Sequence, residues 1–420
     1  MRPYFTRERF GRPQFLAGLL LLAFLAQGLW LVHAEIATTQ GLDIQEAIRI
    51  GEGWKQWHGQ GIAAAPLTES AKDSAHDPFE SNQRGFDTEH SPLLYLASAA
   101  PLLAWPRDLT GDSAAYWRWL PKIPFLACGL FLGASLWYVA RRLCGNAGGF
   151  IALTLYCFSP SLIQASAVWH TEPEIVAAWG AFGSIFTAIA VAHTLYAPRE
   201  VVLWNWRRIV LLGVSLAIAI GSQFSFVVLV PLALGFLLYV APVRQKAGLV
   251  IWVAACMVAL VLLFAAYFFH PHTFAESMRQ AVYWGATWRG FTFLGVYKQV
   301  AVQIGRACPA LAPLFPVAII TYAAWPRTRY FGNAAPLLVA VLFIVLAIAH
   351  PHTAGAGFLI AAIPFLFVFV SGVLADLLET SYRPLILACV LALLITYVVR
   401  ILLALAQVPR GWRLDLLFLG

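Results

Sequence analysis

Long apolar runs separated by short polar segments dominate the chain. The runs 15–31, 125–140, 175–192 and 209–243 contain no charged residue, and each is near or above the ~20 apolar residues that a helix needs to cross the hydrocarbon core of a bilayer. The pattern predicts an all-α, polytopic membrane helix bundle of about 11 spans. The predicted spans are 15–34, 120–140, 148–168, 174–195, 208–221, 225–242, 248–269, 307–324, 333–349, 355–376 and 384–407, and the pair on either side of Gly221–Gln223 could instead form a re-entrant hairpin.

Composition supports this interpretation: 60% of the 420 residues are hydrophobic and only 11% are charged, too few to cover a soluble domain. The net charge of +8 does not indicate a nucleic-acid partner, because the Arg and Lys residues sit in short loops between apolar runs, where they mark the cytoplasmic side and contact membrane lipids. We therefore expect a multi-pass protein of the inner (plasma) membrane, with a cytoplasmic N-terminus and a retained first span. The first run, with basic residues ahead of it, also resembles a signal peptide, so its cleavage is the alternative.

This topology predicts one transmembrane domain over residues 1–420, with a long first outer loop at 35–119 that carries the active site. Surface-lying helices are expected at 42–59 and 91–105. Twelve of the twenty acidic residues fall in this loop, and eight of the ten histidines fall on the outer side. Ionisable groups crowded at one membrane face indicate a hydrated site, and an ordinary solvated loop is the alternative.

Four segments carry a family resemblance: Asp43–Arg49, Ser91–Tyr95, His170–Glu174 and Phe358–Phe365. Their order along the chain, with one span before the outer loop and many after it, resembles the GT-C superfamily of membrane glycosyltransferases, most closely the protein O-mannosyltransferase and lipid A aminoarabinose transferase branches. The resemblance implies an inverting glycosyltransferase that takes its sugar from a polyprenyl-phosphate donor at the outer, periplasmic face. The chain departs from the family at Ser222–Phe224, where Thr-Lys-Gly often supplies a lysine for the donor phosphate.

Such a transfer needs a carboxylate to take a proton from the acceptor and cations to stabilise the leaving phosphate. Two of the four segments are acidic motifs, Asp43–Arg49 as the first and His170–Glu174 as the second. Asp43 and Glu46 of the first motif and Glu172 of the second are the candidate catalytic residues. The cations and aromatic rings of the outer segments could instead form an interfacial aromatic belt. The candidate substrate-binding residues are His90, Tyr95, His170, Glu174, Arg279, Trp284, Arg289, Lys298, Arg306 and His352.

The tetrapeptide His-Pro-His-Thr occurs at 270–273 and again at 350–353. His270, His272, His350 and His352 could bind a divalent metal, the one candidate cofactor, because neutral imidazole is a common ligand. Helix-ending turns, in which proline stops a helix, are the alternative. The six cysteines show no CxxC spacing and predict neither a disulfide framework nor a zinc site.

Two other classes of function stay open. A multi-pass transporter would place ionisable residues near the middle of its spans and show two related halves, neither of which the sequence displays. A non-catalytic GT-C-like assembly subunit would fit the missing lysine and the altered acidic motif. The expected partners are a polyprenyl-phosphate sugar donor and membrane lipids, and neither the sugar nor the acceptor can be named from the sequence.

Overall fold

A computed structural model describes residues 12–38, 44–59, 87–105, 118–167, 174–196, 206–283, 289–350 and 353–407 of the chain. For residues 37–38, 44–48, 289 and 353–356 it describes the backbone alone. The described residues form helices and turns and contain no strand, which confirms the all-α prediction. They fall into two compact units, each built from separate stretches of the chain.

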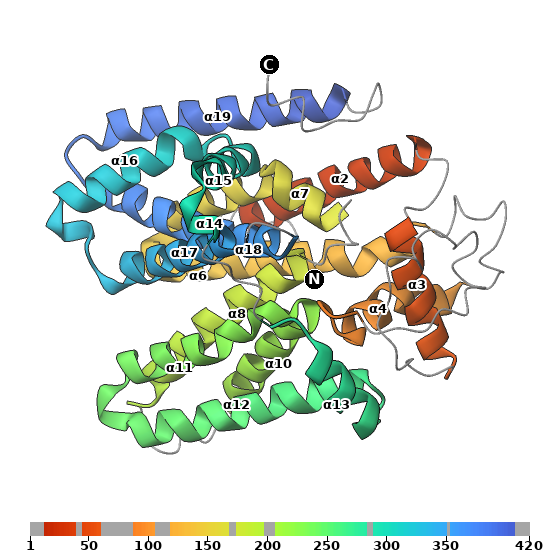
Figure 1. Cartoon of the computed structure of the whole chain (residues 1–420). Helices are drawn as coiled ribbons and strands as arrows, with labels where there is room; N and C mark the ends of the chain where they lie inside the picture. Colours follow the sequence, from red (N-terminus) through yellow and green to blue (C-terminus); the bar gives the residue numbers. More distant parts are fainter. Residues whose placement is uncertain are drawn as a thin grey trace, which may run out of the picture. The chain divides into compact units, whose positions relative to one another are not determined.

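Unit 1 consists of residues 1–38, 126–168 and 287–420. Its most buried helix is α18 (Thr353–Leu377), which packs along α17 (Phe331–Ala349) (Figure 1). Tyrosine hydroxyls join distant stretches of this unit, since Tyr397 donates to the carbonyl of Phe158 at 2.7 Å and Tyr156 to that of Gly129 at 2.5 Å. The other helices of unit 1 are α2 (Pro13–Thr38), most of α6 (Ile123–Cys157), α7 (Pro160–Ala167), α14 (Arg289–Thr292), α15 (Leu294–Ala307), α16 (Leu311–Ala324), η7 (Pro326–Thr328) and α19 (Arg383–Gln407).

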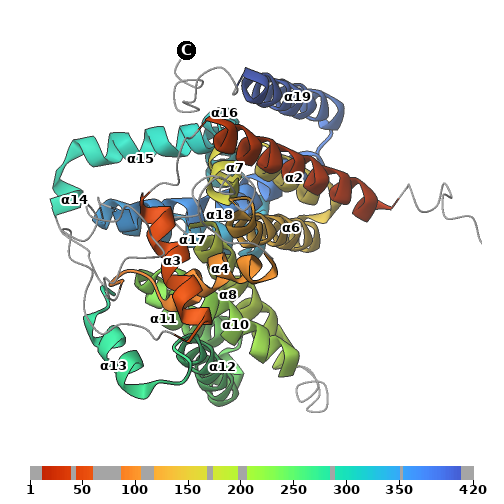
Figure 2. The same cartoon turned by 90° about the vertical axis from the view of Figure 1, so that its right-hand side faces the viewer.

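Unit 2 consists of residues 39–125 and 169–286. Helix α10 (Trp206–Ser222) lies between α8 (Glu174–Thr194) and α12 (Gln245–Ala266) (Figures 1 and 2). Glycines allow these close contacts, because a Cβ at Gly180 would lie 2.5 Å from the Ala219 nitrogen and one at Gly213 would lie 2.6 Å from the Ala255 oxygen. The unit also contains α3 (Ile44–Trp57), α4 (Pro92–Ala99), η2 (Ala100–Ala104), η4 (Leu120–Lys122), η5 (Phe224–Val228), α11 (Leu229–Val240), η6 (Pro242–Arg244) and α13 (Pro271–Gln280).

Each of the eleven predicted spans coincides with helix, but not all of these helices meet the length of a full span. Seven described helices are long and apolar enough to cross a membrane, and an eighth candidate is the pair α15 and α16, bent by 107°. The predicted spans 120–140 and 148–168 fall on α6 and α7, and α6 is itself kinked at Cys144 and Gly145, where Gly145 has a φ of +72°. The predicted spans 208–221 and 225–242 correspond to helical segments of at most 17 residues. The count of eleven therefore stays a prediction.

Both helices expected in the first outer loop are present. The segment predicted at 42–59 forms α3 over Ile44–Trp57, and the one predicted at 91–105 forms α4 followed by η2 over Pro92–Ala104. The sequence does not predict helices α13 and α15, because residues 270–306 lie between the predicted spans 248–269 and 307–324 and were expected to form a loop. Polar and charged residues alternate with apolar ones there, and an amphipathic helix satisfies that pattern as well as a loop does.

Candidate functional site

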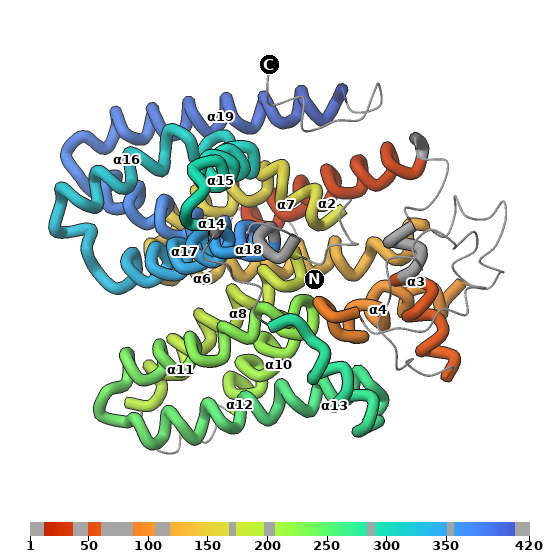
Figure 3. The backbone as a smooth tube through the Cα atoms, viewed as in Figure 1, coloured from red at the N-terminus to blue at the C-terminus, as the bar shows by residue number. Residues whose placement is uncertain are grey.

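Two helices from the segment predicted as the first outer loop lie face to face within unit 2. Helix α3 packs on α4 (Figure 3), and the contact is close at Gly53, where a Cβ would lie 2.0 Å from the backbone oxygen of Tyr95. The indole Nε1 of Trp57 donates to the carbonyl of Leu96 at 2.9 Å. Residues of α3 that face this contact therefore lie next to Tyr95.

The loop that leads into α4 is fixed by hydrogen bonds to the break between α10 and η5. Ser91 caps α4, accepting from the Leu93 nitrogen, and its hydroxyl and backbone nitrogen both donate to the carbonyl of Gly221, at 2.8 and 3.0 Å. The backbone nitrogen of Phe224 in turn donates to the carbonyl of Glu89 at 2.9 Å. Because both partners are interrupted helix ends, the loop satisfies backbone groups that would otherwise lack a partner.

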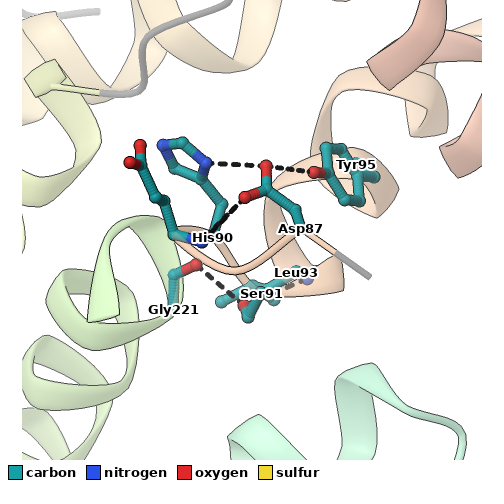
Figure 4. A network of polar contacts seen from close by, with 7 residues as sticks. Asp87, His90, Ser91, Leu93, Tyr95 and Gly221 are labelled. Atoms are coloured by element: carbon teal, nitrogen blue, oxygen red, sulfur yellow. Dashed lines mark hydrogen bonds and ion pairs between the residues drawn. The ribbon is translucent and has the colours of Figure 1, made fainter. Parts of the chain in front are cut away.

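Asp87 and His90 of this loop form a largely buried polar cluster with Tyr95 of α4, here called the Asp87 network (Figure 4). The Oδ2 atom of Asp87 accepts from the Tyr95 hydroxyl at 2.5 Å and lies 2.8 Å from Nδ1 of His90. Its Oδ1 atom accepts from the backbone nitrogens of Glu89 and His90, at 2.8 and 3.2 Å. One carboxylate thus fixes a histidine ring, a phenol and the turn between them.

The pKa values of Asp87 and Tyr95 differ from those of exposed groups. Burial alone would raise the pKa of the Asp87 carboxyl, but the charge of His90 and the hydrogen bonds from His90, Tyr95 and the Glu89 backbone outweigh it and place the pKa well below its ordinary value. Burial and the negative charge of Asp87 raise the pKa of Tyr95 well above its ordinary value. Asp87 is therefore an anion and Tyr95 a neutral hydrogen-bond donor near neutral pH.

Helix α3 brings a cation to the same place. The positive charge of Arg49 acts on the Tyr95 phenol, and among the described residues the buried Nη1 of Arg49 has no hydrogen-bond partner. On the same helix, Glu52 lies 3.7 Å from Lys55, and burial raises the pKa of Glu52 against the opposing effect of that ammonium. A buried guanidinium nitrogen without a partner is costly unless another group meets it, so Arg49 is a candidate to contact an anion.

The structure brings together His90 and Tyr95 of the predicted site. Glu174 opens α8 in the same unit and is buried, and Arg279 is exposed on α13, 3.6 Å from Glu276. Lys298 and Arg306 both lie on α15 in unit 1. Of the other predicted residues, Asp43, His170, Glu172, Trp284 and His352 lie outside the described residues, and Glu46 on α3 and Arg289 on α14 are described in their backbone alone.

The candidate metal ligands do not form a group within the described part of the chain. His270 and His272 flank the start of α13 in unit 2, and His350 follows α17 in unit 1, with its Nδ1 2.8 Å from the carbonyl of Leu346. The described residues contain no group of three or more His, Cys, Asp or Glu that could hold a metal ion. Because His352 is not among them, the metal stays a prediction.

Sequence reasoning missed Asp87 and Arg49. Asp87 is one of the twelve acidic residues in the segment 35–119, and nothing in its neighbourhood marked one acid over the others. The spacing Asp-x-x-His, which puts residues 87 and 90 within reach across one turn, was the available signal. Arg49 was noted only as the end of the first acidic motif.

The chain is similar in structure to known membrane proteins over nearly its whole length. No family model matches the chain, and no curated protein matches it. Among solved structures, the oligosaccharyltransferase of Archaeoglobus fulgidus tethered with an acceptor peptide aligns with 96% of this chain and 56% of its own length, at a TM-score of 0.58 and 13% identity. ArnT from Cupriavidus metallidurans bound to undecaprenyl phosphate aligns with 96% of this chain and 74% of its own, at a TM-score of 0.55 and 15% identity.

The chain has the GT-C fold. A second structure of the archaeal enzyme, AglB in complex with an inhibitory peptide and a dolichol-phosphate, aligns with 93% of the chain at a TM-score of 0.53. At identities of 13–15% the likeness shows the fold alone, and the chain spans about half the length of the archaeal enzyme. The resemblance inferred from the four sequence segments is thereby confirmed at the level of the GT-C fold.

The ionised state of Asp87 predicts how stability depends on pH. Its folded pKa lies below the value of about 3.9 in an unfolded chain, so its contribution to stability is complete above about pH 5 and is lost as the pH falls through the folded pKa. We expect the difference in Tm between wild type and Asp87→Asn to be constant from about pH 5 to 6 and to shrink below about pH 4. Thermal unfolding in nanodiscs at stepped pH measures this. A difference that instead grows on acidification would mean that Asp87 is neutral in the folded protein.

Proposed function

We propose that this chain is an inverting membrane glycosyltransferase. It transfers a sugar from a polyprenyl-phosphate donor to an acceptor at the outer, periplasmic face of the inner membrane. The observation that carries the proposal is the likeness of nearly the whole chain to two GT-C proteins. Structures of both contain a lipid phosphate, undecaprenyl phosphate for ArnT and dolichol-phosphate for AglB.

In the proposed mechanism a carboxylate of the first outer loop takes a proton from the acceptor hydroxyl or amine as it attacks the sugar. Asp43 and Glu46 are the candidates, and Glu172 of the second acidic motif either shares this role or orients the acceptor. Support for the first pair comes from α3, which carries Glu46 and packs on the helix of the Asp87 network. Attack from the side opposite the departing phosphate inverts the configuration at the anomeric carbon.

The departing lipid phosphate gains charge during transfer and needs donors directed at it. We assign this role to His90, because His90 belongs to the loop that pairs with residues 221–224, the segment that lacks the family's lysine. Arg49, whose charge acts on the neighbouring Tyr95 phenol, is the second candidate donor. Arg279, Arg289, Lys298 and Arg306 remain candidate cations, and Tyr95, His170, Glu174, Trp284 and His352 remain candidate contacts to sugar or acceptor.

The test is made on the purified full chain in nanodiscs. We expect saturable binding of undecaprenyl phosphate, together with loss of sugar from at least one member of a panel of radiolabelled polyprenyl-phosphate sugars when an envelope extract supplies acceptors. Binding without transfer, across the whole panel, would favour the non-catalytic subunit. Absence of binding to both undecaprenyl and dolichyl phosphate would overturn the proposal.

A further inference from the structure

The hydrogen bonds of Asp87 leave its carboxylate little freedom. Both oxygens are engaged, Oδ1 by two backbone nitrogens of the turn and Oδ2 by His90 and Tyr95. The chain that follows is fixed in turn, because Ser91 is bonded to Gly221 and the Glu89 carbonyl to Phe224. Asp87 therefore cannot turn away from His90 without breaking several contacts at once.

This arrangement fixes the orientation of the His90 ring. An ionised carboxylate only accepts hydrogen bonds, so the ring nitrogen beside it, Nδ1, carries a proton. Figure 4 shows the second ring nitrogen on the side of the imidazole away from Asp87. Among the described residues no hydrogen bond is made by that second nitrogen, Nε2. One edge of the ring is thus committed to the protein and the other is available to a ligand.

The network also has the donors that an anion site requires. Both nitrogens of an imidazolium donate hydrogen bonds. In that form Nε2 donates to an anion while Nδ1 stays bonded to Asp87. The Arg49 guanidinium, with its buried nitrogen lacking a partner among the described residues, adds a second donor from the facing helix.

We propose that Asp87 is the positioning residue of the lipid-phosphate site: it holds the Nδ1 edge of His90 so that Nε2 meets the phosphate oxygens of the donor. The inference rests on the proposed function, and it adds a residue that acts through His90 rather than on the substrate. Tyr95 has a supporting part, because its hydroxyl donates to the same carboxylate oxygen that faces the ring.

A double-mutant cycle tests whether Asp87 acts through His90. The measured quantity is the Kd for undecaprenyl phosphate of the full chain in nanodiscs, for wild type, Asp87→Asn, His90→Gln and the double variant. We expect Asp87→Asn to weaken binding about 10-fold and His90→Gln about 10- to 30-fold, in the range of a lost charge-assisted hydrogen bond. The double variant should bind no more weakly than His90→Gln, since Asp87 has nothing left to position.

Glu89→Gln is the matched control, because it also removes a carboxylate from the loop but not one that holds His90; we expect its Kd within about two-fold of wild type. If Asp87→Asn does not fold, as judged by its Tm, the same cycle is run with Tyr95→Phe, which loosens the Asp87 carboxylate but keeps its charge. We then expect a loss of about three-fold in the wild-type background and none alongside His90→Gln.

The outcomes separate this inference from the proposed function. Losses that multiply in the double variant, or an Asp87→Asn protein that binds like wild type, would overturn the positioning role and leave the glycosyltransferase proposal standing. A wild-type chain that does not bind the lipid phosphate would overturn both.

Discussion

Replacing Asp43 by Asn and Glu46 by Gln in one protein is expected to lower sugar transfer by about 10²–10⁴-fold, the usual contribution of a general base. Binding of undecaprenyl phosphate should change by less than about three-fold, because neither carboxylate is proposed to contact the phosphate. Transfer is expected to fall because, without the carboxylate, no base takes the proton of the acceptor as the new glycosidic bond forms. The measurement is the initial rate of transfer beside the Kd for the lipid phosphate.

A matched control is Glu379→Gln. This carboxylate is well exposed and pairs with Arg327, and an exposed ion pair contributes at most about 1 kcal/mol, so transfer should stay near the wild-type rate. The single variants then assign the base, since the one that reproduces the double loss identifies it. Transfer that persists undiminished in the double variant would exclude both acids and leave Glu172 as the candidate.

The second large effect is expected at Gly53, where α3 meets α4. Even the single methyl group of Gly53→Ala would be built 2.0 Å from the Tyr95 carbonyl oxygen and 2.8 Å from the Ala99 Cβ. Because the obstacle is backbone, the helices must separate, and overpacking of this kind costs about 1–3 kcal/mol, occasionally more. We expect a lower Tm and, since α3 carries Glu46 and Arg49, a loss of transfer as well.

Gly235→Ala provides the comparison within the same unit. Gly235 lies in α11, and a Cβ there meets nothing within 4 Å, so the substitution should be neutral or stabilise the helix by up to about 1 kcal/mol. The measurement is the Tm of Gly53→Ala and of Gly235→Ala, determined by thermal unfolding in nanodiscs. Equal Tm values for the two would show that α3 and α4 do not pack as closely as described.

The sequence predicted the helices of this protein well because apolar length determines them. Helices α8 and α17 begin and end within two residues of the predicted spans. The interruptions were harder to predict, because they depend on single backbone conformations, such as Gly145 at positive φ within α6. Helix α15 was missed because its polar residues resemble those of a loop, and its packing against α17 and α18 is not visible in the local sequence.

Residues of the candidate site could be predicted where their type and motif identify them, but not where only the three-dimensional arrangement brings them into the site. Tyr95 was selected because a resembling motif contains it and His90 because it directly precedes that motif, and both belong to one network. Asp87 could not be selected, since its importance comes from a turn that directs one acid among many toward a histidine. Arg49 is similar: its position beside Tyr95 depends on how α3 crosses α4, and this follows from a glycine contact that no local pattern encodes.

The bonds that fix the loop before α4 involve main-chain atoms of residues 221 and 224. Because these are backbone groups, the bonds themselves do not depend on which side chain stands at position 223. A protein in which this lysine is replaced would keep these backbone hydrogen bonds, and a neighbouring residue would then have to supply the positive charge for the phosphate. Under the proposed function, His90 and Arg49 supply the positive charge that the family's lysine provides, so glutamine at position 223 does not by itself argue against catalysis.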